Sequence, residues 1–328
     1  MLKKYINYNK KRNIFFLKKY IIFKITSIII ILYLVLRNNN TNGNYFQKNM
    51  NNNIFNKKNN PYEKCYFPPD NSNIKIIHLV MTKFLIDYFF KNDFPKRMYT
   101  KEYVLNGIRV MKNYLFPSLE NQSCKKFKWI LMLGDKANIT YIKTLLNFNN
   151  SFEMDIVYNN SIKSYVQNIS KGYDVLITSR IDYDDRIYYD AVNDVRKVIN
   201  NKKPMFIFGY NRGVLYYEND KKYYDFDYNF NNEGALGIFL SLIVVLDKVN
   251  DTYNIYEIGA HTVVRKMLLN YYKKYGIKEL KYDPGSFYDG QPKFVYVRQN
   301  YSTVINFSMS IKKRLRNYNF NLSKFYGK

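Results

Sequence analysis

Short apolar runs alternate with stretches of helical spacing from about residue 74 to residue 208, and this alternation constrains the fold more than any other feature of the chain. Runs rich in β-branched and aromatic residues predict strands, whereas apolar residues spaced three and four apart predict helices. Strands joined by helices form a mostly parallel, doubly wound α/β sheet with helices on both faces. The predicted strands are residues 75–81, 129–133, 154–158, 173–178 and 205–208, and the predicted helices are residues 103–118, 136–146, 162–169 and 186–199.

The regular alternation ends near residue 209. Residues 214–228 are rich in tyrosine with alternating charges, which predicts antiparallel strands or a long loop. Residues 235–246 are strongly apolar, residues 260–272 have helical spacing, and residues 294–298 predict a last strand. We therefore expect the α/β domain to have a less regular C-terminal half.

Composition and charge limit the class of protein. The chain has 328 residues, of which 47% are hydrophobic and 18% aromatic, and this is enough for a sizeable core. Its formal charge of +26 raises nucleic acid as a partner, because clustered Lys and Arg neutralise phosphates. However, the first 62 residues contribute much of this charge without any acidic residue, and the chain has no zinc-finger spacing or recognition-helix pattern. Nucleic acid is therefore only a runner-up partner.

The N-terminal region has the pattern of a membrane anchor. Residues 20–36 are almost wholly apolar apart from Lys24, and as a helix they would span roughly 25 Å of a bilayer. The basic residues before this stretch would stay in the cytoplasm by the positive-inside rule. We expect a single-pass type II membrane protein with a cytoplasmic tail (1–19), an uncleaved signal anchor (20–37) and a luminal catalytic part. A removed signal peptide and a buried amphipathic helix are the alternatives.

An Asn-rich, low-complexity tract follows the predicted anchor and predicts a stem or linker over residues 38–72. The catalytic domain is expected over residues 73–304, with a basic tail at 305–328. Several N-x-S/T sequons in the domain agree with a luminal glycoprotein. The only cysteines, Cys65 and Cys124, allow one disulfide in an oxidising compartment or two free thiols in a reducing one.

The candidate site follows a predicted strand, at residues 178–185, which read Thr-Ser-Arg-Ile-Asp-Tyr-Asp-Asp. In an extended backbone, Asp182 and Asp184 would point to one side and Tyr183 to the other. Mg²⁺ and Mn²⁺ take one or two carboxylates and complete their shell with water and substrate phosphates. A D-x-D pattern alone is a weak signal, because such turns also occur as solvated loops. Its place at a strand end predicts Mn²⁺ or Mg²⁺ bound by Asp182 and Asp184.

Other catalytic patterns are missing from the sequence. Neither a P-loop nor a dinucleotide-binding G-x-G-x-x-G follows the first predicted strand, which argues against NTPases and dehydrogenases. Covalent catalysis by Cys or Ser is not expected, because neither of the two histidines is adjacent to a cysteine and no serine lies in a nucleophile-elbow pattern. Without a glycine-rich loop, the metal itself must bind the diphosphate. This favours a nucleotide-sugar glycosyltransferase of the GT-A kind.

Several segments between residues 74 and 300 form an ordered pattern, and they are residues 78–84 (HLVMTKF), 116–119 (FPSL) with Gln122 and 127–130 (FKWI), 178–185 (TSRIDYDD), 208–210 (FGY) and 259–261 (GAH). In this order they resemble the rhamnosyltransferases of GT-A type. The chain departs from that family at Lys83, where the family has arginine, and at residues 298–300, which read Arg-Gln-Asn where the family has His-Gly-x-Asn. The expected late histidine ligand of the metal is therefore missing from the pattern.

The resemblance implies an inverting, metal-dependent transfer of a sugar, for example rhamnose, from a nucleoside-diphosphate sugar to a glycan or glycoconjugate acceptor. The metal would bridge the two donor phosphates and stabilise the leaving diphosphate. An inverting transfer also needs a carboxylate base for the acceptor hydroxyl. The expected residues are Thr82, Lys83, Asp135, Arg180, Asp182 and His261 for donor binding, Asp182 and Asp184 for the metal, and Glu233 or Glu257 for the base.

One further expectation concerns the acidic segment. Asp185 is expected to cap a helix that begins at Arg186, because a carboxylate there would accept from free backbone N–H groups. Two other classes of protein remain open: another metal-dependent phosphoryl enzyme, and a membrane-tethered binding protein in which residues 182–185 form only a polar turn.

Overall fold

The computed structural model of the chain describes residues 65–66, 73–86, 98–146, 150–199, 204–210, 212–219, 221–227, 238–249, 251–258, 272, 291–298 and 318–327. The chain divides into two units, Met1–Asn60 and Pro61–Lys328, and every described residue belongs to the second. The predicted cytoplasmic tail and signal anchor therefore lie outside the described residues. The predicted domain boundaries stay predictions.

The expectation of a single-pass type II membrane protein is corrected. Within the part of the chain that the structure describes, none of the helices is long and apolar enough to cross a membrane. The longest of these helices, α3 (Lys101–Asn113), has 13 residues, whereas a bilayer core needs about 20. The segment for which the span was predicted, residues 20–37, is outside the described residues.

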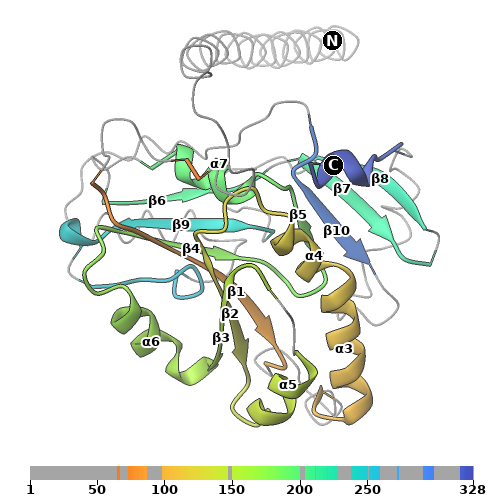
Figure 1. Ribbon diagram of the computed structural model, residues 1–328, viewed down its shortest axis with the longest axis horizontal. Coiled ribbons are helices and arrows are strands. Elements are labelled where there is room, and N and C mark those ends of the chain that lie inside the picture. The colour runs from red at the N-terminus through yellow and green to blue at the C-terminus, as the bar shows by residue number, and fades with distance from the viewer. Residues whose placement is uncertain are drawn as a thin grey trace, which may run out of the picture. The chain divides into compact units, whose positions relative to one another are not determined.

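Six strands form the main sheet, and they are β1 (Ile76–Phe84), β2 (Lys128–Leu133), β3 (Glu153–Tyr158), β4 (Val175–Arg180), β6 (Met205–Phe208) and β9 (Leu240–Val245). Their order across the sheet is β3-β2-β1-β4-β9-β6 (Figure 1). The first four pair in parallel, and β9 is antiparallel to both β4 and β6. The predicted α/β fold with a mostly parallel sheet is thus confirmed.

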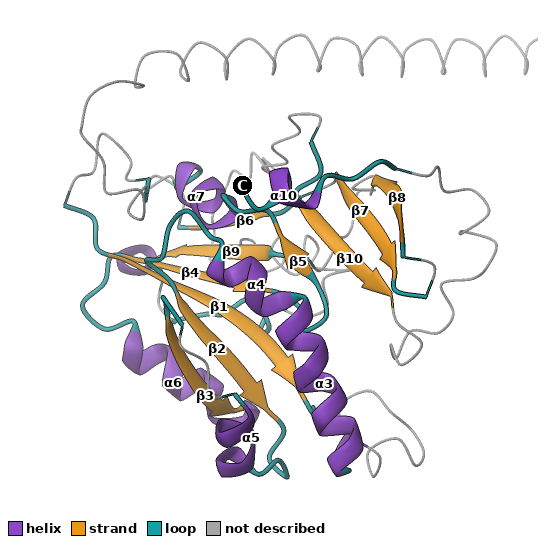
Figure 2. Cartoon of the chain, turned by 45° about the vertical axis from the view of Figure 1, so that its right-hand side comes forward, coloured by secondary structure: helices purple, strands orange, loops and turns teal. Residues whose placement is uncertain are grey.

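Helices cover both faces of this sheet (Figure 2). Because side chains alternate along a strand, Val80 and Phe84 of β1 point to one face and Leu79 and Met81 to the other. The first face packs against α3, α4 (Leu115–Glu120), α5 (Ile139–Leu145) and α7 (Ala191–Lys197). The second face packs against α6 (Ile162–Ile169) and against residues 251–258.

A smaller sheet of four strands contains β5 (Arg186–Ile187), β7 (Arg212–Tyr217), β8 (Lys222–Asp227) and β10 (Phe294–Arg298), in the order β5-β10-β7-β8. The antiparallel pair β7–β8 resolves the alternative left open for the Tyr-rich region, because this region forms strands and not a long loop. Gly213 lets the ring of Phe294 approach closely, since an added Cβ would lie 2.3 Å from that ring.

The predicted helix at residues 103–118 is divided at Tyr114, where α3 ends and α4 begins. Pro117 explains the break, because proline lacks an N–H and its ring clashes with the carbonyl four residues earlier in a continuous helix. That carbonyl belongs to Asn113, the last residue of α3. It accepts a hydrogen bond from Nη2 of Arg186 instead, at 3.1 Å.

The predicted helix at residues 186–199 begins only at Ala191. Arg186 and Ile187 pair with β10 as the short strand β5, which sequence-local spacing did not reveal. The predicted capping role of Asp185 is therefore wrong. Its carboxylate is buried and accepts from the backbone N–H of Val297 at 3.2 Å, so it connects the acidic segment to β10.

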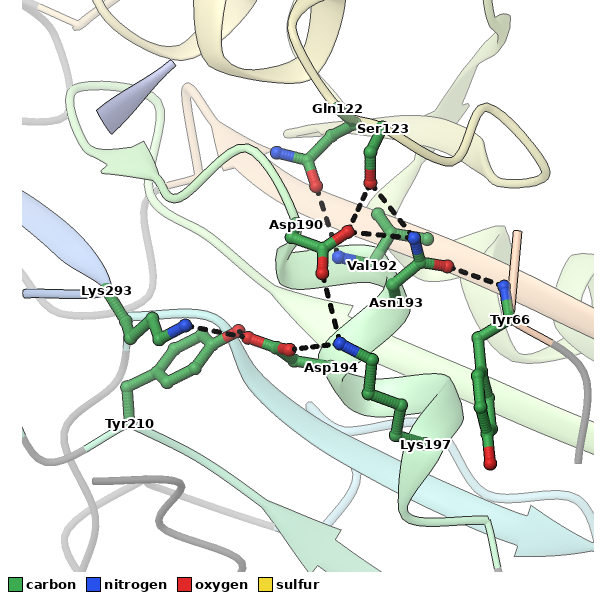
Figure 3. A network of polar contacts seen from close by, with 10 residues as sticks. All are labelled: Tyr66, Gln122, Ser123, Asp190, Val192, Asn193, Asp194, Lys197, Tyr210 and Lys293. Carbon is green, nitrogen blue, oxygen red and sulfur yellow. Dashed lines mark hydrogen bonds and ion pairs between the residues drawn. The ribbon is translucent and has the colours of Figure 1, made fainter. Parts of the chain in front are cut away.

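A polar network around α7 joins the two sheets (Figure 3). Asp194 accepts from the hydroxyl of Tyr210 at 3.0 Å, just after β6, and pairs with Lys293 at 3.4 Å, just before β10. Lys197 pairs with Asp194 at 3.1 Å and with Asp190 at 3.0 Å. Burial opposes the charge of Lys197, but the two carboxylates outweigh it and raise the pKa of this lysine.

Cys65 and Cys124 form a disulfide, which resolves the alternative that the sequence left open. The bond holds residues 65–66 against the loop between α4 and β2. Beside it, the backbone N–H of Tyr66 donates to the side-chain oxygen of Asn193 at 2.8 Å, and Asn193 donates to Ser123 at 3.0 Å. The disulfide therefore joins the network around α7 to a segment that precedes the main sheet.

His78 is the third residue of β1 and is buried. Its Nε2 forms a hydrogen bond with the hydroxyl of Ser179 at 2.8 Å, and its Nδ1 has no hydrogen-bond partner among the described residues. Burial, assisted by the positive charge of Arg196, holds the pKa of His78 well below 6.5. The imidazole is therefore neutral in the folded protein at neutral pH.

This burial predicts a pH dependence of stability. Below about pH 6.5 the unfolded chain binds a proton at His78 that the folded chain does not bind. The free energy of unfolding should then fall by about 1.4 kcal/mol per pH unit, until the depressed folded pKa is reached. Urea unfolding between pH 8 and pH 5 should show this slope only below about pH 6.5, and in His78→Gln the slope there should be shallower by the equivalent of one proton. Equal slopes for both proteins would contradict the prediction.

Candidate functional site

The carboxyl ends of β1 and β4 frame the candidate site. From β1 the chain continues outward to β2 and β3, whereas β4 lies on the other side of β1, so the strand order reverses between β1 and β4. Ligands of open α/β sheets bind beside the carboxyl ends of the strands at such a point. The backbone N–H of Ile181 donates to the carbonyl of Met81 at 3.0 Å and holds these two ends together.

Four side chains meet at this edge of the sheet: Lys83 from β1, Arg180 from β4, Asp182 just beyond it, and Tyr256 from the segment at 251–258. Nη2 of Arg180 lies 3.5 Å from Oδ1 of Asp182. Nζ of Lys83 lies 4.2 Å from the ring centre of Tyr256, and Cζ of Arg180 lies 5.3 Å from it. The side chain of Asp182 is 48% exposed and that of Arg180 14%, so the group is partly open to solvent.

The two cations influence each other. Burial lowers the pKa of Lys83 to about 8, the charge of Arg180 lowers it as well, and Asp182 acts in the opposite direction. Burial also raises the pKa of the Tyr256 hydroxyl, so this group stays neutral at physiological pH. Two cations and one carboxylate leave the group with a positive balance. Such an arrangement suits an anionic ligand with more than one charge.

The acidic segment is a turn and not the extended chain that the sequence analysis expected. β4 ends at Arg180, and the backbone N–H of Asp185 donates to the carbonyl of Asp182 at 3.2 Å. After burial, the charge of Asp184 is the main cause that raises the pKa of Tyr183, with a smaller effect from Asp182, and Asp184 also raises the pKa of Tyr103. The expectation that Asp182 and Asp184 alternate along an extended backbone is therefore wrong.

The two other predicted residues at the strand ends differ in exposure. Thr82 is buried, and its hydroxyl accepts from the indole N–H of Trp129 at 3.0 Å, so its side chain belongs to the core. Asp135 is exposed, just after β2. It follows Gly134, where an added Cβ would lie 2.1 Å from the carbonyl oxygen of Leu85. Only glycine fits this close approach between the ends of β1 and β2.

The candidates for the catalytic base and the late histidine lie elsewhere or outside the described residues. Glu257 accepts from the backbone and the side chain of Asn254, both at 2.8 Å, and lies 3.7 Å from Nζ of Lys163 on α6. Burial raises its pKa. The structure thus shows Glu257 with these partners and not with the group at the strand ends. Glu233 and His261 lie outside the described residues.

Sequence reasoning missed Tyr256, whose ring packs beside both cations. The segment that contains it is fixed by tertiary contacts, since the backbone N–H of Ile255 donates to the hydroxyl of Thr178 in β4 at 2.8 Å. The hydroxyl of Tyr256 donates to the carbonyl of Met81 at 3.2 Å. No spacing or motif around residue 256 indicates these contacts, because their partners are more than 70 residues away in the sequence.

The described residues fit metal binding by one or two carboxylates, and they do not form a closed cage of protein ligands. Among the described residues, no three His, Cys, Asp or Glu side chains gather into a group that could hold a metal ion. A closed cage of protein ligands is therefore not seen in that part of the chain. Mg²⁺ and Mn²⁺, however, often use only one or two carboxylates together with water and substrate phosphates, and the exposed carboxylate of Asp182 fits this mode.

Comparisons with known proteins give only weak structural likenesses. No protein-family model and no curated protein sequence matches the chain. HddC from Yersinia pseudotuberculosis shows 18% identity and a TM-score of 0.30, over 54% of this chain and 82% of that one. A protein from Desulfovibrio desulfuricans described as a nucleotide-diphospho-sugar transferase shows 12% identity and a TM-score of 0.33, over 72% of this chain and 90% of that one. A protein from Bacillus anthracis described as a glucose-1-phosphate thymidylyltransferase shows 12% identity and a TM-score of 0.33, over 68% of this chain and 86% of that one. Similarities at this level carry no argument about function.

Proposed function

We propose that the chain is a metal-dependent glycosyltransferase that uses a nucleoside-diphosphate sugar and transfers the sugar, for example rhamnose, to a glycan or glycoconjugate acceptor. One observation carries the proposal: Lys83, Arg180 and Asp182 lie together at the strand ends where the sheet order reverses. Two cations beside a carboxylate suit a diphosphate that is bound together with a divalent cation. The resemblance to rhamnosyltransferases in the sequence agrees with this reading.

The residues of the site would have distinct roles in such a transfer. Arg180 can donate two parallel hydrogen bonds to a phosphate, whereas Lys83 acts as a point charge. Both would stabilise the negative charge that grows on the leaving diphosphate. Asp182 and Asp184 would bind Mn²⁺ or Mg²⁺, which when bound would neutralise part of the phosphate charge.

An inverting transfer also needs a base that accepts the proton of the acceptor hydroxyl. Glu233 and Glu257 stay the candidates for this role. The raised pKa of Glu257 is a property that a general base can use, because proton transfer is most efficient when the pKa lies near the working pH. His261 and Asp135 stay candidates for donor contacts.

Replacement of Asp182 tests the proposed activity. The full-length chain with Mn²⁺ should hydrolyse or transfer at least one member of a panel of common nucleoside-diphosphate sugars, and EDTA should abolish this. In Asp182→Ala the rate should fall by at least about 100-fold, since a charge that stabilises the transition state is lost. Asp174→Ala is the matched control, because it removes an aspartate from the amino end of the same strand, where its carboxylate accepts from the N–H of Lys75.

Three outcomes of this assay would count against the proposal. Turnover that survives in Asp182→Ala would remove Asp182 from the site. Binding of a nucleotide sugar without any turnover would favour a binding protein. Release of diphosphate from a nucleoside triphosphate and a sugar phosphate, with no transfer from a sugar nucleotide, would indicate another metal-dependent phosphoryl enzyme.

A further inference from the structure

The ring of Tyr256 lies beside two cations that come from different strands. Nζ of Lys83 is 4.2 Å from the ring centre, and Cζ of Arg180 is 5.3 Å from it. Both distances are within the range in which the negative face of an aromatic ring attracts a cation. One ring therefore contacts both positive groups at the point where the strand order of the sheet reverses.

The position of this ring is fixed from three directions. Its hydroxyl donates to the carbonyl of Met81 in β1 at 3.2 Å. The preceding residue, Ile255, is buried, and its N–H donates to Thr178 of β4 at 2.8 Å. The following residue, Glu257, closes the turn through Asn254 at 2.8 Å. The ring thus belongs to a segment that is hydrogen-bonded to the same two strands that supply the cations.

Two like charges at one site repel each other, and something must hold them in place before an anion arrives. Asp182 is close to Arg180 but half exposed, so solvent weakens its effect. A neutral ring can attract both cations without neutralising their charge. The interaction energy is about 0.5–1 kcal/mol for an exposed cation–π contact and more for a desolvated one. A carboxylate in its place would neutralise the cations and compete with an anionic ligand.

We propose that Tyr256 is a positioning residue. Its ring holds Lys83 and Arg180 close together, so that both can bind one diphosphate group. The inference rests on the proposed function for its ligand, because the diphosphate would be that of the donor nucleotide. It goes further in naming the residue that prepares the site and in predicting that diphosphate binds there without a metal.

Inorganic pyrophosphate is the probe, and isothermal titration of the full-length chain in EDTA is the measurement. The wild-type chain should bind pyrophosphate, and Tyr256→Leu, which removes the ring, should weaken binding by about tenfold, the equivalent of two cation–π contacts. Tyr256→Phe keeps the ring and loses only the hydroxyl, so its affinity should stay within about threefold of wild type. Tyr165→Leu, which removes a tyrosine of α6 whose hydroxyl donates to Asp155 of β3, is the control for ring loss elsewhere.

A double-mutant cycle separates positioning from general damage to the fold. In a Lys83→Met background one of the two cations is gone, so Tyr256→Leu should cost clearly less affinity than it does in the wild type. An equal cost in both backgrounds would overturn the proposed coupling. Thermal unfolding of each variant identifies those that no longer fold. If Tyr256→Leu does not fold, Tyr256→Phe still tests the proposal, because a loss of more than about threefold in that variant would assign the effect to the hydroxyl and overturn the role of the ring.

The outcomes distinguish this inference from the proposed function. Unchanged pyrophosphate binding in Tyr256→Leu, equal losses in the Phe and Leu variants, or no binding by the wild type in EDTA would each overturn the role of the ring. If the ring effect is found but no sugar nucleotide is turned over, the positioning role stands and the glycosyltransferase proposal fails. If turnover is found without a ring effect, the reverse holds.

Discussion

Replacing Asp194 by alanine should lower the free energy of unfolding by about 3–5 kcal/mol, because it removes the partner of buried positive charge. The carboxylate is 10% exposed and pairs with Lys293, itself 9% exposed, at 3.4 Å. It also accepts from the hydroxyl of Tyr210 and pairs with Lys197 (Figure 3). Without it, two ammonium groups lose a shared counter-charge, and a buried hydroxyl loses its acceptor. Urea unfolding at neutral pH measures the change.

Two further variants show whether burial causes this effect. Asp194→Asn keeps the shape and an acceptor oxygen but removes the charge, so it should lie between wild type and Asp194→Ala. Glu153→Ala is the matched control, since Glu153 pairs with Lys128 at 3.0 Å while its side chain is 76% exposed. An exposed pair of this kind contributes about 0–1 kcal/mol. A loss in Asp194→Ala no larger than in Glu153→Ala would contradict the prediction.

Elements with strong local spacing could be predicted from the sequence. The expected bounds of β6, β10 and α6 agree with the structure, because each has an apolar pattern that is complete within a few residues. β5 could not be predicted in this way. Its two residues pair with β10, more than 100 positions later in the chain, and such non-local pairing overrides the local helical spacing after Arg186.

The strand positions explain which side chains of the candidate site lie together. A parallel sheet brings strand ends to one edge, so Lys83, Arg180 and Asp182 could be expected together from strand positions alone. Strict alternation along β1 could also have shown that Thr82 shares the core face with Val80 and Phe84, which the choice of Thr82 as a donor contact overlooked.

Tyr256 differs from these residues, because it reaches the site through a segment whose place is set by tertiary hydrogen bonds. One of these bonds joins Ile255 to Thr178, and another joins the Tyr256 hydroxyl to Met81. Single-sequence patterns contain no information on contacts of that kind. The polar network around Asp194 was missed for the same reason, since Asp194 and Lys197 of α7, Tyr210 and Lys293 come from three separated parts of the chain.

Removing the disulfide between Cys65 and Cys124 should lower the free energy of unfolding by about 4 kcal/mol. The two cysteines are 59 residues apart, and a cross-link of that span restricts the unfolded chain to this extent in the loop-entropy description. The double variant Cys65→Ala/Cys124→Ala should therefore unfold at a clearly lower urea concentration than wild type. Reduction of the wild type with dithiothreitol should give a similar shift, while the double variant should not respond to it.

The same disulfide should be energetically coupled to the network around α7. Next to it, the N–H of Tyr66 donates to Asn193, which also contacts Asp190 at 2.8 Å, and Asp190 pairs with Lys197. Residues in one hydrogen-bonded network do not contribute additively. Asp194→Ala should thus cost less stability in the double-cysteine variant than in wild type, by about 0.5 kcal/mol or more. Strict additivity would mean that residues 65–66 are attached by the disulfide alone and that Tyr66 adds nothing to the stability of α7.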